Sequence, residues 1–195
     1  MTKTILYLHG FASSSNSNKA KILSSYISKI SSNSKLMIPN LDNNFKKAVS
    51  QIELLIKNSD QPISFIGSSL GGYFAAYFAS IENAKAILIN PAIPPLKGFD
   101  EYLGENKNYS TGQKFLIEEE DIKFLRQLLT KKYLNKENTL VLMESGDDVL
   151  EYKKTSKYFE GCHIDIVFGG SHSYESMGEK PVSYTHLRAH ETESN

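Results

Sequence analysis

Several features that mark particular protein classes are scarce in this sequence. It contains one cysteine, Cys162, so the chain can form no internal disulfide and no cysteine-based zinc site. The charges of its 22 basic and 22 acidic residues cancel. The chain therefore lacks the basic excess that is typical of proteins that bind a nucleic-acid backbone. There is no long apolar run or signal peptide, because the first apolar stretch, residues 5–8, is only strand length. We therefore expect a cytoplasmic protein with no membrane span, nucleic-acid partner, metal or cofactor.

The composition that remains is that of a globular protein. Of the 195 residues, 40% are hydrophobic and 23% are charged, which allows one compact domain with a sizeable core. Residues 181–195, PVSYTHLRAHETESN, show no helical or strand periodicity and resemble translated adapter sequence. We therefore expect one domain over residues 1–180 and a non-native tail, and we exclude His186 and His190 from the candidate site.

Short apolar runs alternate with helical stretches along the chain. The predicted strands are residues 4–8, 35–38, 63–66, 85–89, 139–143 and 164–168. The predicted helices are residues 19–30, 43–57, 70–80 and 118–134. Asp42 is the expected N-cap of the second helix. Several strands are continuous apolar runs, as in sheets that helices cover on both faces. The alternation predicts an α/β fold with a doubly wound, mostly parallel sheet of about six strands.

A serine, an aspartate and a histidine each follow a predicted strand. Ligands of such sheets bind beyond the carboxyl ends of the strands, where all three residues should meet. The stretch FIGSSLGGYF, residues 65–74, contains the pattern G-x-S-x-G between a strand and a helix. That pattern places its central serine on a sharp, exposed turn. Ser69 is central because Gly67 and Gly71 flank it at the required spacing, whereas Ser68 occupies the variable position.

A serine nucleophile needs a base, an acid and donors for the oxyanion. His172 is the predicted base, because His163 lies at the start of a strand and so at the wrong edge of the sheet. The acid is predicted to be Asp147, with Asp148 as its rival and Glu144 as a third candidate. The alternative for the two aspartates is an N-cap of a helix over residues 149–157.

The oxyanion donors are expected from two backbone segments. The N–H of Leu70 opens the predicted helix after the serine, and the N–H of Phe11 lies in the loop after the first strand. His9 is expected to order this loop rather than to act as a base.

These motifs together resemble the α/β-hydrolase superfamily, and within it the small bacterial YqiA/YcfP-like esterase group. The matching stretches are YLHGFASSSNSNKA (7–20), IGSSLGGYFA (66–75), NPAIPP (90–95), YLGENKNYSTGQKF (102–115), SGDDVLEY (145–152) and GGSHSY (169–174). The resemblance implies a minimal hydrolase core with Ser69 as nucleophile, Asp147 as acid and His172 as base. The chain departs from the family in its C-terminal helix, which is expected to stop within residues 175–180.

The function implied is hydrolysis of a small-molecule carboxylic ester through an acyl-Ser69 intermediate. An acyl-CoA thioesterase is a close alternative, and a non-catalytic binding protein on a hydrolase scaffold is another. Residues 91–117 form an expected cap-like insertion rich in apolar side chains. They either cover the serine and favour an acyl group or anchor the loop to the core. The sequence indicates neither the acyl length, nor the leaving group, nor the oligomeric state.

Overall fold

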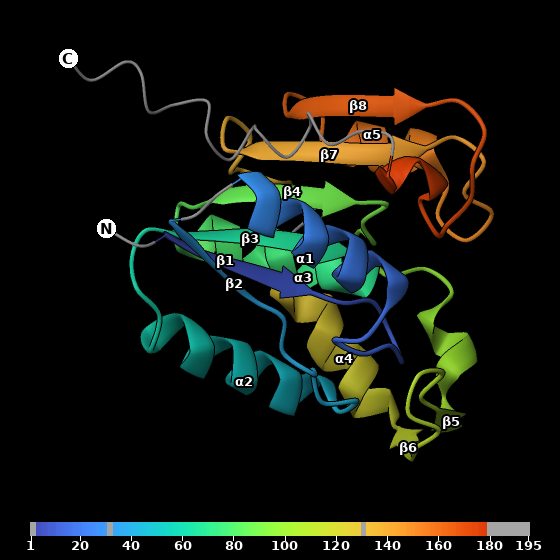
Figure 1. Cartoon of the computed structure of the whole chain (residues 1–195). Coiled ribbons are helices and arrows are strands. Elements are labelled where there is room, and N and C mark those ends of the chain that lie inside the picture. The colour runs from blue at the N-terminus through green and yellow to red at the C-terminus, as the bar shows by residue number, and fades with distance from the viewer. Residues whose placement is uncertain (1–2, 31–32, 130–131, 179–195) are drawn as a thin grey trace.

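A six-stranded parallel sheet forms the centre of the molecule (Figure 1). The computed structural model describes residues 3–30, 33–129 and 132–178. The strand order is β2-β1-β3-β4-β7-β8, and every neighbouring pair is parallel. The bounds are β1 Lys3–Leu8, β2 Ser34–Met37, β3 Ile63–Ser68, β4 Lys85–Ile89, β7 Thr139–Glu144 and β8 His163–Val167. The doubly wound sheet and its six predicted strands are therefore confirmed.

Helices cover both faces of this sheet. The α-helices are α1 Asn18–Ile30, α2 Phe45–Lys57, α3 Leu70–Ile81, α4 Glu119–Leu128 and α5 Tyr152–Tyr158, and the 3₁₀ helices are η1 Phe99–Tyr102 and η2 Glu175–Gly178. Side chains of α2, α3 and α4 share one core cluster with one face of the strands, whereas those of α1 and η2 share a second cluster with the other face. Figure 1 shows α2 and α4 together on one side of the sheet.

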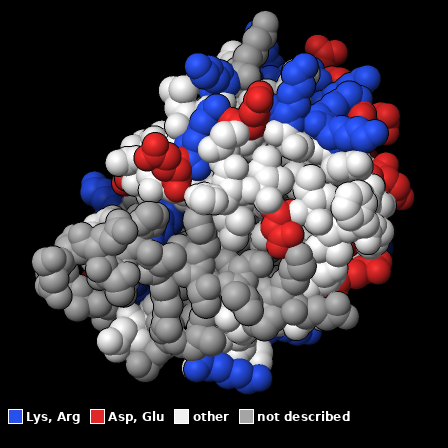
Figure 2. All heavy atoms as spheres, turned by 90° about the horizontal axis from the view of Figure 1, so that it is seen from above, with Lys and Arg blue, Asp and Glu red and all other residues white. Residues whose placement is uncertain are grey.

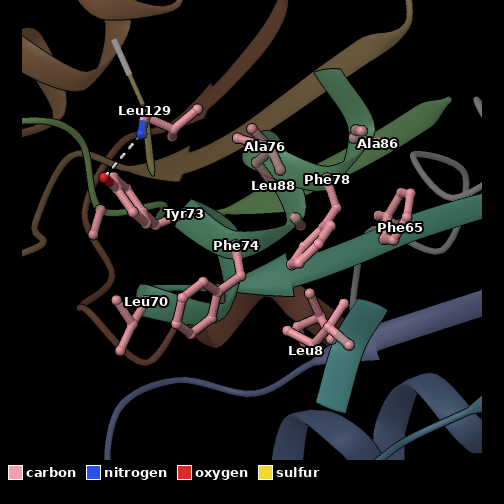
Figure 3. Packing of buried hydrophobic residues seen from close by; sticks show 14 of the residues in the cluster. Leu8, Phe65, Leu70, Tyr73, Phe74, Ala76, Phe78, Ala86, Leu88 and Leu129 are labelled. Carbon is pink, nitrogen blue, oxygen red and sulfur yellow. Dashed lines mark hydrogen bonds between the residues drawn. The ribbon is translucent and has the colours of Figure 1, made fainter. Parts of the chain in front are cut away.

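The helix α3 lies at the centre of the larger core cluster. Nine of its twelve residues are buried, as its apolar and small composition predicts. Phe74 and Phe78 point toward the strand residues Leu8 and Phe65 in the close view (Figure 3), and the rings of Phe65 and Phe78 stack with centroids 6.4 Å apart. Burial of each such ring contributes about 1.5–3 kcal/mol to folding. The helix that follows Ser69 is therefore firmly fixed against the sheet.

Two predicted ends of helices are wrong. The N-cap of α2 is Asn44, whose side chain accepts from the N–H of Lys47, and not Asp42. Asp42 instead accepts from the N–H of Asn44 and so stabilises the turn before the helix. Aspartate and asparagine suit an N-cap about equally well, so residue type alone could not distinguish Asp42 from Asn44.

The helix α4 ends at Leu128, earlier than the predicted residue 134. Leu129 has an extended backbone, and its N–H donates to the hydroxyl of Tyr73 at 3.2 Å (Figure 3). That hydroxyl in turn donates to the carbonyl of Leu125 at 2.6 Å. A tertiary contact with α3 therefore ends the helix, although the local sequence is compatible with its continuation.

The segment expected to be a cap-like insertion, residues 91–117, contains η1 and a short antiparallel hairpin, β5 Gly104–Lys107 with β6 Lys114–Ile117. Its aromatic side chains form a ring cluster with Phe11 and the α2 residue Phe45, and the centroid distances are 4.6–6.3 Å. The insertion contributes three rings to this cluster, Phe99, Tyr102 and Phe115. These side chains anchor the insertion to the core, whereas Leu103 and Tyr109 remain exposed.

Figure 2 shows basic and acidic side chains close together along one side of this face, next to a broad area in which most described side chains are uncharged. No helix within the described ranges is long and apolar enough to cross a membrane. In the same part of the chain, no three His, Cys, Asp or Glu side chains are grouped so that they could hold a metal ion. The expected tail, residues 181–195, lies outside the described residues, as do residues 179–180 of the range in which the C-terminal helix was expected to stop.

Candidate active site

The three side chains predicted to act together lie in one hydrogen-bonded chain. His172 Nε2 is 3.0 Å from Ser69 Oγ, and His172 Nδ1 is 2.8 Å from Asp147 Oδ2. Ser69 follows β3, Asp147 follows β7, and His172 follows β8. Because all the strands of this sheet are parallel, these three segments emerge at the same edge. The structure therefore brings together residues that are up to 103 positions apart in the sequence.

Ser69 lies on a sharp turn between β3 and α3. Its φ of 54° is in the left-handed region, which costs a non-glycine residue about 1–3 kcal/mol unless the surroundings fix it. Three backbone hydrogen bonds do so: the Ser69 N–H donates to Ile89, and the Ser69 carbonyl accepts from Tyr73 and Ala92, at 3.0–3.1 Å. The hydroxyl caps no helix N–H, so it remains available to His172.

The glycines of the G-x-S-x-G pattern allow the close approach that this turn requires. A Cβ atom on Gly67 would overlap the carbonyl of Gly71, and a Cβ atom on Gly71 would overlap the carbonyl of Leu8. Strand and helix therefore pack backbone to backbone, which pushes the intervening serine outward. Ser68, by contrast, is buried at the end of β3 and has no contact with His172 among its hydrogen bonds to described residues.

Asp147 is the acid that contacts the histidine. Its side chain is only 2% exposed, and its Oδ1 accepts from the N–H groups of Val149 and Leu150. Asp148 is exposed. Neither aspartate caps α5, because that helix begins at Tyr152 with Glu151 as its N-cap, so the expected helix from residue 149 is wrong. The turn formed by the Asp147 carboxylate occupies the residues that were predicted to be helical.

The two backbone N–H groups predicted as oxyanion donors belong to segments next to Ser69, since Leu70 follows the serine directly and Gly10, before Phe11, packs against its side chain. Leu70 is the first residue of α3, and Phe11 lies in the loop after β1. Among hydrogen bonds between described residues, neither N–H is a donor. The Phe11 ring is fixed by the ring cluster, and the neighbouring Ala12 carbonyl accepts from the N–H of Tyr109. The positive end of the α3 helix adds a favourable potential for an anion at this place.

His9 stabilises the loop that carries Phe11. It is buried, its Nε2 accepts from the N–H of Leu41 at 3.0 Å, and its Nδ1 lies 2.9 Å from the carbonyl of Gly10. Burial lowers the pKa of this imidazole, and the hydrogen bond to Gly10 opposes that shift. A neutral ring that donates from Nδ1 satisfies both contacts, as expected for a residue that orders the loop.

The charge state of His9 predicts a pH-dependent stability. Because its pKa is lowered in the folded state from 6.5, the unfolded chain binds a proton that the folded chain excludes. The free energy of unfolding should therefore fall as the pH drops below about 6.5, by at most about 1.4 kcal/mol per pH unit. Urea unfolding at pH 7 and pH 5 should show a smaller loss in His9→Gln, whose amide oxygen can still accept from Leu41. Equal losses in both proteins would contradict this role.

Two buried polar side chains contact the loop that carries His172. The sequence did not single out Asn90, and it indicated Glu144 only as a third candidate for the acid. Asn90, directly after β4, donates from Nδ2 to the carbonyls of Ser171 and His172 at 3.0 and 3.3 Å. Glu144, at the end of β7, accepts from the backbone N–H groups of Ser171, Glu175 and Ser176, and none of its hydrogen bonds to described residues involves the imidazole. Glu144 is the last residue of β7 and Asn90 directly follows β4, and this position at the carboxyl end of a strand is the sequence signal that points to them.

Solved structures of α/β hydrolases share this fold. Est1E from Butyrivibrio proteoclasticus, in complex with ferulic acid, superposes with a TM-score of 0.69 at 16% identity, over 96% of this chain and 87% of that one. The mouse α/β hydrolase domain-containing protein 10 gives a TM-score of 0.66 at 16% identity, over 95% and 87% of the two chains. An α/β serine hydrolase homologue from Coxiella burnetii gives 0.59 at 13% identity, over 96% and 84%. The predicted hydrolase fold is confirmed.

Sequence comparison identifies the narrower family. A UPF0227 protein of Vibrio parahaemolyticus is 27% identical over 182 residues, which cover 88% of this chain and 90% of that protein. The model of the family described as "Uncharacterised protein family (UPF0227)" matches residues 4–188. The chain therefore belongs to the UPF0227 family.

Proposed function

We propose that the protein is a serine hydrolase that cleaves carboxylic esters of small molecules. The observation that carries the proposal is the continuous chain from Ser69 Oγ through His172 to Asp147, with contacts of 3.0 and 2.8 Å. A hydroxyl, an imidazole and a buried carboxylate in this order are the groups that convert serine into a nucleophile.

In the proposed reaction, Ser69 Oγ attacks the acyl carbonyl while His172 Nε2 takes its proton. The tetrahedral oxyanion accepts from the N–H groups of Phe11 and Leu70, each worth about 3–4 kcal/mol in the transition state. His172 then gives the proton to the leaving alcohol, and the acyl group remains on Ser69. Water, deprotonated by His172, attacks the acyl-enzyme, and the carboxylic acid leaves as the serine regains its proton.

Asp147 fixes the orientation of the imidazole in this scheme. Its Oδ2 accepts from His172 Nδ1, so Nε2 is free of hydrogen and can act as the base. Burial of the carboxylate, together with its two backbone donors, holds it in place and stabilises the imidazolium that forms. Asp148 has no part in the proposed reaction.

The apolar side chains next to Phe11 suit a substrate with an apolar or aromatic acyl group. Est1E, which has a similar fold, binds ferulic acid, an aromatic acid. An acyl-CoA thioester would undergo the same steps with a thiol as the leaving group. A binding protein without activity would not need the hydrogen-bonded chain.

Hydrolysis assays with two substrate series test the proposal. The first series consists of p-nitrophenyl esters from acetate to dodecanoate, and the second consists of acyl-CoA thioesters of the same acyl lengths. We expect turnover of at least one ester that exceeds the rate measured with Ser69→Ala. A higher kcat/KM for every thioester than for its ester would favour the thioesterase, and no turnover in either series would favour the binding protein.

A further inference from the structure

The base of the proposed reaction stands on a segment without regular secondary structure. Between β8 and η2, residues 168–174 form no helix or strand. Gly169 and Gly170 both have positive φ values, 90° and 70°, so the chain turns sharply just before His172. The position of the imidazole therefore depends on side chains that hold this segment from outside.

The carboxylate of Glu144 binds the segment on both sides of His172. Its Oε2 accepts from the N–H of Ser171 at 2.7 Å and from that of Glu175 at 3.0 Å, and its Oε1 accepts from the N–H of Ser176 at 2.7 Å. Glu144 ends β7 and is fully buried, so the carboxylate projects from a strand of the central sheet. One side chain thereby fixes three backbone positions around the base.

The segment is shaped to fit this carboxylate. A Cβ atom on Gly170 would overlap both carboxylate oxygens of Glu144, so the backbone packs directly against the side chain. The Glu144 N–H donates to Asn90 Oδ1 at 2.9 Å, and Asn90 holds the carbonyls of Ser171 and His172. On the outer side, Lys19 Nζ donates to the carbonyl of Ser173 at 2.8 Å. Glu144 is thus the centre of a network that surrounds His172 without touching its ring.

The charge of Glu144 agrees with this arrangement. Burial by itself would raise the pKa of the carboxyl group, but hydrogen bonds from Ser176, Ser171 and Glu175 lower the pKa below its ordinary value of 4.5. The group is therefore ionised at neutral pH, and its bonds to the N–H groups are charge-assisted, which makes them stronger than neutral ones.

We propose that Glu144 is a positioning residue, which holds residues 171–176 so that His172 Nε2 faces Ser69. This inference rests on the proposed function, because it concerns the base of that reaction. It replaces the third-ranked interpretation of Glu144 as the acid, since both its oxygens bind backbone N–H groups and His172 Nδ1 faces Asp147.

Substitution of Glu144 should affect kcat more than KM. In Glu144→Gln, the amide NH₂ replaces one acceptor and faces a backbone N–H, so the segment shifts and the imidazole is misplaced. A displacement of about 1 Å at a reacting group lowers the rate on the order of 100-fold, and we expect kcat to fall about 10- to 100-fold with KM within about threefold of wild type. Glu144→Asp keeps the negative charge on a shorter side chain, so its kcat should lie between those of wild type and Glu144→Gln.

A matched control is Asn135→Ala. Asn135 is also buried and donates from Nδ2 to two backbone carbonyls, those of Ala79 and Ala84, but near the starts of β4 and β7, at the opposite edge of the sheet. Its loss should lower the melting temperature about as much as the loss of the Glu144 contacts and leave kcat at the wild-type value. Loss of stability alone is thereby separated from loss of position.

A second readout is independent of turnover. In the wild-type protein, the His172 Nδ1 proton shared with Asp147 should give a far-downfield proton NMR resonance, assigned by its absence in His172→Gln. We expect this resonance to broaden or vanish in Glu144→Gln, to remain weakened in Glu144→Asp and to persist in Asn135→Ala.

The outcomes separate the two proposals. A wild-type kcat and an unchanged resonance in both Glu144 variants would overturn the positioning role and leave the serine hydrolase intact. If Glu144→Gln does not fold, the same two measurements on Glu144→Asp decide, and wild-type values there overturn the role. If the wild-type protein hydrolyses no ester or thioester, the proposed function fails, whereas the resonance still reports whether Glu144 positions His172.

Discussion

Replacement of Ser69 by alanine should abolish ester hydrolysis. Loss of the nucleophile from a serine-histidine-aspartate site lowers kcat on the order of 10⁶-fold, which leaves only what the oxyanion donors and binding provide. Ser69 Oγ is the atom 3.0 Å from the imidazole, and no described residue next to it offers a second hydroxyl in the same position. The melting temperature should stay within a few degrees, because the hydroxyl caps no helix and the backbone contacts of the turn remain.

The matched control for this variant is Ser68→Ala. Ser68 differs from Ser69 by one position, is buried at the end of β3, and makes no hydrogen bond to His172 among the described residues. We expect its kcat/KM to lie within about threefold of wild type, which stopped-assay rates of both purified variants would measure. Loss of activity in Ser68→Ala with retention in Ser69→Ala would reverse the assignment of the nucleophile.

Asp147→Asn should lower kcat about 10⁴-fold. An amide at this position can donate to Nδ1 and so stabilises the tautomer in which Nε2 carries the hydrogen and cannot accept the serine proton. The backbone turn should persist, because the amide oxygen can still accept from the N–H groups of Val149 and Leu150. The effect should therefore appear in kcat rather than in the melting temperature.

Asp148→Asn is the control for this second variant. Its carboxylate is exposed and makes no hydrogen bond that involves His172, so its removal should change kcat less than twofold. Both variants lose one negative charge from adjacent positions, so a difference between them cannot arise from net charge. Equal losses of kcat in the two variants would contradict Asp147 as the acid.

The sequence predicted the sheet and the elbow because both depend on local patterns. Continuous apolar runs identify strands that helices cover on both faces, and all six proved to be neighbours in one sheet. The spacing of Gly67, Ser69 and Gly71 identified the turn, since close packing of strand and helix tolerates no side chain at either glycine. The shared edge of a parallel sheet then placed Asp147 and His172 near the serine.

Features set by distant contacts could not be predicted in the same way. The hydroxyl of Tyr73 ends α4 at Leu128, and nothing near residue 128 in the sequence carries that information. Each strand of the hairpin β5–β6 is only four residues long, and neither GENK nor KFLI alternates apolar with polar residues. The sequence of this segment therefore resembles that of a loop. The contacts of Glu144 are to backbone N–H groups, which every sequence has, and no residue pattern distinguishes them.

The measurement that tests the central claim most directly is labelling of the folded protein with a fluorophosphonate. The probe phosphonylates a serine only when a base activates it and a nearby oxyanion site receives the charge. Peptide mass spectrometry should locate the adduct on Ser69 in wild-type protein and in Ser68→Ala, with no adduct in Ser69→Ala and much slower labelling in Asp147→Asn. An unlabelled Ser69 in the folded wild-type protein, or an adduct on another serine, would contradict the account.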